Sequence, residues 1–288
     1  MGNRKVNISF KDYKKLPRLR IFITPEMRKI MNKTNVLEQT NLTSRNKYRY
    51  RKAERSLPLK YLYSNPKLFL KIIQKQPKFI THGGTRITLP NYINEDVAYL
   101  SGFICGDGNL TTTTKRDYWV SIHNKQMELL ETALKIIKNI FDYKAKISNG
   151  HGCHKVEIRS MIIHSFFNKI MNIENGRKEN IKIPMKIKAN RNLVRAFIAG
   201  FFDAEGNVNL KRNNITCQIS FCQKQKRILE EIKNELEREG IEMNLYKNQK
   251  YYVLYGNKNS LKTFSEKIPF VHPIKREKLE TALRNQIN

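Results

Sequence analysis

The sequence predicts an α+β protein made of two pseudo-symmetric αββαββα repeats and a small, mainly helical N-terminal domain. Three observations carry this prediction. A nine-residue pattern occurs twice, at Leu100–Gly108 and Ile198–Gly206, and similar segments follow each copy. The copies lie 98 residues apart, a spacing typical of domains rather than of solenoid repeats. The first third of the chain is the most basic. We therefore expect domains at 1–82, 83–190 and 191–288.

Both copies of the pattern are predicted to be helices that pack against each other. Each copy has two small residues four positions apart on one helical face, Gly102 and Gly106 in the first and Gly200 and Ala204 in the second. Residues without large side chains let two helix backbones approach closely. Each helix should end at the glycine that follows its last acid, because glycine is favoured just after a helix C-terminus.

Each copy of the pattern ends in a carboxylate, Asp107 in the first and Glu205 in the second. If the two helices pair, the acids emerge side by side, and adjacent carboxylates repel each other unless a cation lies between them. Sites rich in carboxylate oxygen favour Mg²⁺. The sequence therefore predicts a divalent-metal site to which both repeats contribute.

The segments after each motif show the periodicities of strands and helices. In the first repeat we expect strands at 109–114, 117–123, 143–148 and 154–159, with helices at 125–141 and 160–171. In the second we expect strands at 207–211, 215–222, 242–247 and 251–255, with helices at 224–239 and 258–266. Four antiparallel strands per repeat would cover one sheet face with helices and leave the other open.

The composition points to a polyanionic partner. Lys and Arg number 55 against 25 Asp and Glu, a formal charge of +30, which makes DNA or RNA the first expectation. Residues 1–90 hold 22 basic and 4 acidic side chains, a net of +18. Within them, a short helix from residue 35 and a basic helix over 45–52 resemble a helix-turn-helix, although a helix that only contacts phosphates fits as well. The predicted DNA contacts there are Arg45, Lys47, Arg49 and Arg51, with a linker at Gly83 and Gly84.

The two nine-residue patterns resemble the motifs of the LAGLIDADG homing endonucleases, in the single-chain form with two motifs, and the resemblance covers about residues 80–288. It implies an intron-encoded, monomeric enzyme that makes a metal-dependent double-strand break in a long DNA site and leaves short 3′ overhangs. It also implies that Asp107 and Glu205 bind Mg²⁺, with Mn²⁺ as a plausible substitute, assisted by the backbone carbonyls of Gly106 and Ala204.

The resemblance further implies polar residues around the acids. Asn124 and Gln223 occupy equivalent places in the two repeats, where relatives often position water or phosphate. Lys182 and Lys267 each precede Ile-Pro, which is similar to a family element whose lysine approaches the cleavage site. Lys275 competes with Lys267 for the second of these roles.

The open faces of the two sheets would together form a curved saddle whose strands can enter the major groove of double-stranded DNA. A register error of one residue would turn each side chain to the opposite face. The residues expected to face DNA are Thr111, Thr113, Asn209, Lys211, Gln218, Lys247 and Gln249.

Two functions of other classes stay open: a maturase that folds its own group I intron RNA, and a non-catalytic DNA-binding regulator. Retention of an acid in both motifs favours the nuclease. No apolar run approaches the ~18 residues of a membrane span, and the four cysteines lack Cys-x-x-Cys spacing. We therefore expect an intracellular protein, cytoplasmic in a prokaryote and organellar in a eukaryote. The initial Met1 and the lack of a terminal His-Asn pair favour a free-standing protein over an intein.

Overall fold

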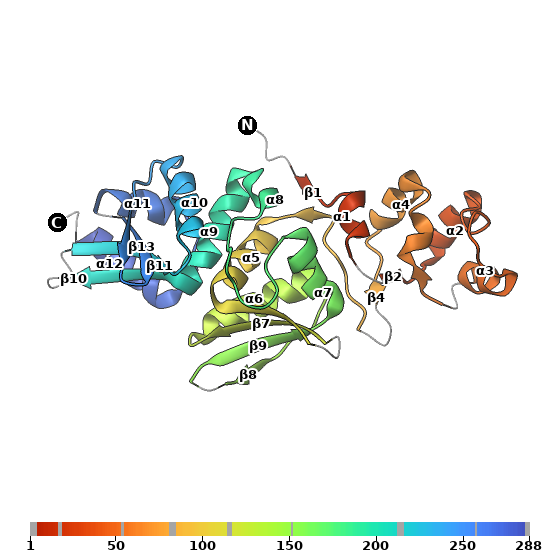
Figure 1. Cartoon of the computed structure of the whole chain (residues 1–288), viewed down its shortest axis with the longest axis horizontal. Helices are drawn as coiled ribbons and strands as arrows, with labels where there is room; N and C mark the ends of the chain where they lie inside the picture. The colour runs from red at the N-terminus through yellow and green to blue at the C-terminus, as the bar shows by residue number, and fades with distance from the viewer. Residues whose placement is uncertain are drawn as a thin grey trace.

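Figure 1 shows the computed structural model, in which the N-terminal elements, the first repeat and the second repeat follow one another along the longest axis of the molecule. The structure describes residues 5–16, 19–52, 55–80, 85–113, 117–150, 152–211, 216–256 and 258–285. The predicted linker at Gly83 and Gly84 lies outside these ranges. No helix in them is long and apolar enough to cross a membrane.

Both repeats have the predicted order of elements, and the α+β fold class is confirmed. The first consists of α5 (Glu95–Asp107), β6 (Gly108–Thr112), β7 (Tyr118–Asn124), α6 (Met127–Phe141), β8 (Ile147–Asn149), β9 (His154–Arg159), α7 (Met161–Ser165) and the π-helical turn Phe166–Ile170. The second consists of α9 (Arg191–Glu205), β10 (Gly206–Lys211), β11 (Thr216–Gln223), α10 (Lys226–Glu237), β12 (Asn244–Asn248), β13 (Tyr251–Gly256) and α11 (Lys258–Lys267). Sequence reasoning missed two further helices, α8 (Met185–Lys188) between the repeats and α12 (Pro273–Arg284).

Each repeat contains one four-stranded antiparallel sheet, with the order β6-β7-β9-β8 in the first and β10-β11-β13-β12 in the second. In every strand of these sheets except the edge strands β8 and β12, apolar residues that point to one face are buried, because that face packs on helices. These core residues include Leu110, Val120, Ile122, Val156 and Ile158 in the first sheet, and Val208, Ile219, Phe221 and Leu254 in the second. The opposite face of each sheet therefore remains available for contacts outside the chain.

The helices α5 and α9 pack against each other through their small residues, as predicted. A Cβ atom placed on Gly102 would lie 2.0 Å from the carbonyl oxygen of Phe197, and one placed on Gly200 would lie 2.0 Å from that of Tyr99. A Cβ on Gly106 would lie 2.3 Å from the Cβ of Ala204. Backbone therefore meets backbone across the pair, and the two helix ends are held side by side.

The two motif helices end where the sequence predicts, although the expected reason was wrong. Gly108 and Gly206 follow the last helical residues with φ of −98° and −82°, which is extended rather than left-handed backbone. Glycine is required there because of space. A Cβ on Gly206 would lie 2.1 Å from the Phe202 ring, and one on Gly108 would lie 2.6 Å from the Cα of Ile104.

The N-terminal region combines short helices with a small sheet. Its elements are β1 (Val6–Asn7), α1 (Phe10–Lys14), β2 (Arg20–Ile21), α2 (Pro25–Lys33), α3 (Ser44–Arg51), β3 (Leu57–Pro58), the 3-10 helix Leu59–Leu62, α4 (Pro66–Ile73) and β4 (Phe79–Ile80). The predicted basic helix is α3, capped by the side chain of Thr43. The predicted short helix from residue 35 was wrong, because residues 35–39 form turns and the preceding helix is α2.

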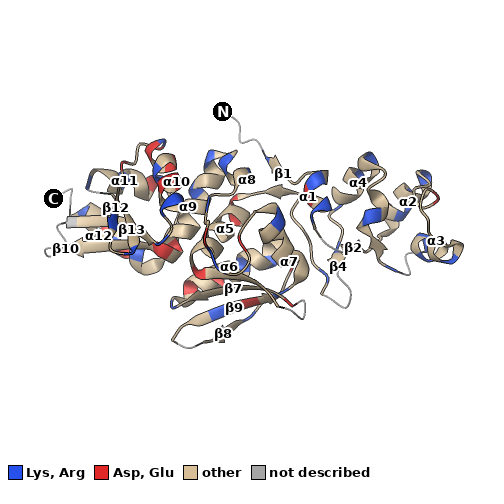
Figure 2. Ribbon diagram, in the orientation of Figure 1, with Lys and Arg blue, Asp and Glu red and all other residues tan. Residues whose placement is uncertain are grey.

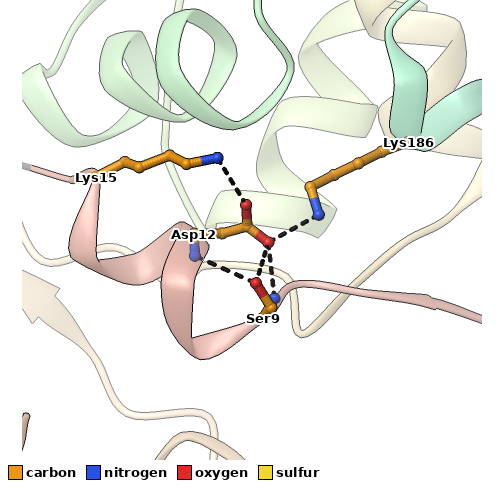
Figure 3. A network of polar contacts seen from close by, with 4 residues as sticks. All are labelled: Ser9, Asp12, Lys15 and Lys186. Atoms are coloured by element: carbon orange, nitrogen blue, oxygen red, sulfur yellow. Dashed lines mark hydrogen bonds and ion pairs between the residues drawn. The ribbon is translucent and has the colours of Figure 1, made fainter.

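The N-terminal region is attached to both the first repeat and the segment between the repeats. Strand β1 pairs with β5 (Tyr92–Ile93), directly before α5. The buried carboxylate of Asp12 accepts hydrogen bonds from the Ser9 backbone N–H at 2.8 Å and from Lys186 in α8 at 2.7 Å (Figure 3). Although burial alone would raise it, the hydrogen bonds of Lys186 and Ser9 lower the pKa of Asp12 to about 2. The docking contact is therefore ionised at neutral pH.

Candidate metal centre

The structure brings the two predicted acids together at the ends of the paired helices. Asp107 is the last residue of α5 and Glu205 is the last residue of α9. The amide nitrogen of Asn124, at the end of β7, donates to Asp107 Oδ2 at 2.6 Å. The amide nitrogen of Gln223, at the end of β11, donates to Glu205 Oε1 at 2.7 Å. Each predicted amide therefore lies beside the acid of its own repeat.

Backbone hydrogen bonds fix the orientation of both amides. The Asn124 side-chain oxygen accepts from the backbone N–H of Gln126 at 2.8 Å, and the Gln223 oxygen accepts from the backbone N–H of Lys224 at 3.1 Å. With its oxygen occupied in this way, each amide presents its NH₂ group to a carboxylate. The NH₂ group in turn holds that carboxylate in one orientation.

Two buried lysines lie at the ends of the same helices. Lys178 Nζ donates to the carbonyl oxygens of Ile104, Cys105 and Gly106 at 2.9, 2.9 and 2.7 Å. Lys275 Nζ donates to the carbonyls of Phe202 and Asp203 at 2.7 and 2.8 Å. Each lysine thus satisfies carbonyls that a helix C-terminus leaves without intrahelical partners.

This arrangement corrects two of the predicted lysines. Lys267 donates to the backbone carbonyl of Glu239 at 2.6 Å and does not reach either acid. Lys182 lies next to Glu174, where its charge helps to lower the pKa of that carboxyl. Lys275, the competing candidate, is at the site, and Lys178 takes the place expected for Lys182. The Ile-Pro that follows Lys182 and Lys267 was therefore not a marker of the site lysine.

The electrostatics of the site favour a bound cation. Burial, and then the charge of Asp107, raise the pKa of Glu205 to about 7, and burial also raises the pKa of Asp107. Burial lowers the pKa of Lys275 to about 8 and lowers that of Lys178. Two desolvated carboxylates so close together require positive charge to stay ionised.

The donor set fits a divalent cation such as Mg²⁺. No cluster of three or more His, Cys, Asp or Glu side chains able to hold a metal occurs in the described part of the chain. The ligands would therefore be the carboxylates of Asp107 and Glu205, completed by carbonyls, water and substrate oxygens, as is usual for Mg²⁺. The Gly106 carbonyl, a predicted ligand, accepts a hydrogen bond from Lys178. The other predicted carbonyl belongs to Ala204, one residue after the last carbonyl bound by Lys275.

The sheet registers show which predicted contact residues lie on the open faces. Thr111 pairs with Trp119 in the first sheet and Asn209 pairs with Gln218 in the second, and all four alternate with buried neighbours. Sequence reasoning missed others on the same faces: Ser121, His123, Lys155 and Arg159 in the first sheet, and Asn207, Ser220 and Tyr246 in the second.

Three of the predicted sheet residues do not lie on the open strand faces, and the side chain of a fourth is not described. The prediction placed Lys247 on the wrong face. Lys247 lies on the same face of β12 as Leu245, which pairs with the buried Leu254, so it lies on the face that packs on the helices. Thr113 and Gln249 lie in the turns that follow β6 and β12 rather than in strands. Lys211 ends β10, and its side chain lies outside the described part of the structure.

The exposed face of α3 differs from the predicted one. Lys47 and Arg51 both form ion pairs with Glu38, the first at 3.1 Å, and Arg49 is half-buried. The predicted Arg45 is exposed, together with Tyr48 and Lys52, which were not predicted, and the Lys52 ammonium lies 5.8 Å from the centre of the Tyr48 ring. These three residues are three and four positions apart, so they lie on one face of a helix. The predicted set took the basic residues at every second position and therefore missed this spacing.

Comparison with family models agrees with the repeats found in the structure. Residues 97–187 match the WhiA LAGLIDADG-like domain, and residues 192–269 match the LAGLIDADG-like domain. The chain contains two LAGLIDADG-like domains. Their boundaries coincide with α5 at the start of one domain and α9 at the start of the other.

Individual relatives share this architecture in part. Over 248 residues the chain is 28% identical to a reverse gyrase of Methanocaldococcus jannaschii, covering 83% of this chain and 14% of that protein. It is 25% identical over 187 residues to a probable translation initiation factor IF-2 of Thermococcus kodakarensis, covering 65% and 15%. Mesophilic variants of the homing endonuclease I-DmoI have the same fold, with 20% identity, a TM-score of 0.50 and coverage of 65% and 97%. The matched region thus covers about one seventh of the length of each of these two sequence relatives.

Proposed function

We propose that this LAGLIDADG protein is a site-specific DNA endonuclease that uses a divalent cation to cut both strands of a long duplex target. One observation carries the proposal: two carboxylates, Asp107 and Glu205, stand at adjacent helix ends, each with an amide and a buried lysine from its own repeat. A pseudo-symmetric pair of such half-sites matches the two antiparallel strands of DNA, one half-site for each strand.

The residues of each half-site have distinct roles in this proposal. Asp107 and Glu205 would hold the cation, which when bound supplies Lewis-acid activation of water and stabilisation of the leaving oxygen. Asn124 and Gln223 keep the two carboxylates oriented. Lys178 and Lys275 place positive charge near the acids, where negative charge would develop on the phosphate. Cutting across the minor groove would leave short 3′ overhangs.

DNA contact would extend along the open sheet faces and over the N-terminal region. Figure 2 shows Lys and Arg positions distributed along the ribbon of α1 to α4, with few Asp or Glu positions. Three of the four acids in residues 1–90, namely Asp12, Glu26 and Glu38, form ion pairs within the chain. The surplus charge of this region is therefore available to phosphates, and the outer face formed by Arg45, Tyr48 and Lys52 is the proposed contact on α3.

The N-terminal region and the repeats also occur together in a relative. Residues 97–288 make up two thirds of the chain, whereas the match to the reverse gyrase covers 83% of it, so the match extends into residues 1–96. The two sequence relatives carry unrelated names and match only about one seventh of their length. Their own activities are therefore not assigned to this chain. A module with its own DNA-directed activity, inserted in otherwise unrelated proteins, accounts both for their unrelated names and for the short matched region.

A non-catalytic DNA-binding regulator is the second candidate, because residues 97–187 match a WhiA-type domain and WhiA-like proteins lack catalysis. The two functions differ in their acids. A regulator has no need for two buried carboxylates whose pKa values burial raises. The intron maturase has no observation of its own in its favour.

A selection on random DNA separates these candidates without knowledge of the target. Duplexes from a randomised library are first captured with the full chain in Ca²⁺, in which we expect binding without cleavage. The captured pool is then given Mg²⁺, and newly formed ends are sequenced. We expect paired cuts at one enriched site, and none with the Asp107→Asn, Glu205→Gln double variant. Capture of a specific sequence that is never cut would instead establish the regulator.

A further inference from the structure

The second motif contains another acid, Asp203, that the nuclease scheme does not use. Its side chain is 1% exposed. The carboxylate accepts a hydrogen bond from the Tyr99 hydroxyl at 2.8 Å, and from the backbone N–H groups of Val271 and His272 at 2.9 and 3.0 Å. A carboxylate buried this deeply is stable only with such donors, so the contacts are specific rather than incidental.

The two backbone N–H donors to Asp203 belong to the segment that carries Lys275. Val271 and His272 lie directly before α12, and His272 is the N-cap residue of that helix. Lys275 stands in the first turn of α12 and is 9% exposed, and its ammonium returns to the carbonyl of Asp203 at 2.8 Å. Asp203 therefore holds both ends of a five-residue segment, the start with its carboxylate and the lysine with its carbonyl.

Tyr99 joins this unit to the other repeat. It lies on α5 of the first repeat, 7% exposed, whereas Asp203 and Lys275 belong to the second. The position of Lys275 is thus fixed partly from across the helix pair.

The first repeat braces its lysine by a different contact. Cys105 occupies the motif position of Asp203 and offers no carboxylate. Instead, the backbone carbonyl of Lys178 accepts a hydrogen bond from the side-chain nitrogen of Gln225 at 2.6 Å. Gln225 is the N-cap residue of α10 in the second repeat. A polar side chain of the opposite repeat therefore contributes to the position of each site lysine, directly for Lys178 through Gln225 and indirectly for Lys275 through Tyr99 and Asp203.

We propose that Asp203, together with Tyr99, is the positioning residue for Lys275, and that Gln225 is the positioning residue for Lys178. The proposal deepens the proposed nuclease function and rests on it. Its consequence is that the two half-sites can be disabled separately by changing side chains that touch neither the DNA nor the cation. A misplacement of about 1 Å at a catalytic group can cost roughly 100-fold in rate.

The test measures the rate of cutting for each DNA strand separately, with strand-specific end labels on the selected target. Asp203→Asn places an NH₂ group where two backbone N–H donors require an acceptor, so we expect one strand to be cut at least about tenfold more slowly, with nicked product accumulating. Gln225→Ala should slow the other strand. Tyr99→Phe removes one of the donors and should give a weaker form of the Asp203→Asn defect.

Cys217→Ser is the control, since it changes a buried cysteine on β11 that is not among the residues that hold either site lysine, and we expect both strands to be cut as in the parent. For every variant, the DNA affinity is measured in Ca²⁺ and the Tm is measured by thermal melting. Cutting rates are compared only among variants that bind DNA and fold as the parent does. Equal slowing of both strands by Asp203→Asn, or slowing of the same strand by Gln225→Ala, would overturn the proposal.

A second readout separates this proposal from the nuclease function. Amide hydrogen exchange at Val271 and His272 needs no cleavage. It should become faster in Asp203→Asn and stay unchanged in Cys217→Ser, which would support the role of Asp203 in holding this segment even if the parent cut no DNA. Unchanged protection of these amides in Asp203→Asn would refute this role whatever the activity of the parent.

Discussion

Replacement of Gly102 by alanine tests whether close contact between α5 and α9 holds the fold and the acids in place. The new Cβ would lie 2.0 Å from the carbonyl oxygen of Phe197 and 2.9 Å from the backbone nitrogen of Phe201. A Cβ rarely comes closer than 3.0 Å to such an atom, so the helices must separate by about 1 Å. Both partners of the clash are backbone atoms, which cannot rotate away.

The sign of the effect is decided by two opposing terms. In an exposed helix, glycine to alanine stabilises by roughly 1 kcal/mol. Overpacking of a rigid core costs typically about 1–3 kcal/mol and occasionally more. Because the clash at Gly102 is between backbones, we expect the upper end of that range, which after the gain of about 1 kcal/mol leaves a net loss of about 2 kcal/mol in the free energy of unfolding. Cleavage should fall as well, since the separation moves the helix ends that carry the acids.

The assay is thermal unfolding followed by circular dichroism. At about 2–4 °C per kcal/mol for a chain of this size class, Gly102→Ala should lower the Tm by roughly 4–8 °C. Gly200→Ala should behave alike, because its Cβ would lie 2.0 Å from the Tyr99 carbonyl oxygen. Gly150→Ala is the control, with its nearest neighbour, the Cys153 carbonyl oxygen, at 3.3 Å. A Gly102→Ala protein that melts at or above the parent temperature would refute the reasoning.

Two further predictions concern the N-terminal region. The pKa of Asp12 is lowered to about 2, below its ordinary value of 3.8, so its ionised form stabilises the fold above pH 4 and this contribution is lost as the pH falls from about 4 towards 2. Asp12→Asn should cost about 1–2 kcal/mol at pH 7, and the stabilities of the parent and the variant, measured by urea titration, should converge only as the pH falls to about 2. For α3, the double variant Arg45→Ala, Lys52→Ala should reduce the magnitude of the slope of log K for DNA against log salt by about 1–2. The double variant Lys47→Ala, Arg51→Ala should reduce it less, because Glu38 already forms ion pairs with both residues. Filter binding at four salt concentrations measures this, and equal slopes for the two variants would contradict the assignment of the outer face.

Local signals explain how much of the fold was predictable. The spacing of small residues in the two motifs and the alternation of apolar residues in the strands are patterns of fewer than ten residues. Both predicted the structure correctly, because each pattern reflects which side chains of a single helix or strand are buried. Helix α12 was missed because its apolar residues, such as Leu279 and Ala282, are separated by charged ones. Its only strong signal is Pro273 after a capping residue, which marks a first turn but not the length of a helix. The turn that replaces the predicted helix near residue 35 includes Asn35 with a φ of 48°, a local conformation that polarity alone does not reveal.

The site lysines show where local patterns fail and what could replace them. Lys182 and Lys267 share a neighbouring Ile-Pro, yet they follow the acids of their repeats by 75 and 62 residues. Lys178 and Lys275 share no neighbours, yet they follow Asp107 and Glu205 by 71 and 70 residues. In a duplicated fold, the chain takes the same course in both repeats from the end of the motif helix, through the sheet and back to the site. The number of residues between the acid and the lysine is therefore a better predictor of the site lysine than its immediate neighbours. What spacing could not reveal is how each lysine is held. One stands on a helix and the other on an irregular segment, and only the packed structure shows that each depends on the opposite repeat.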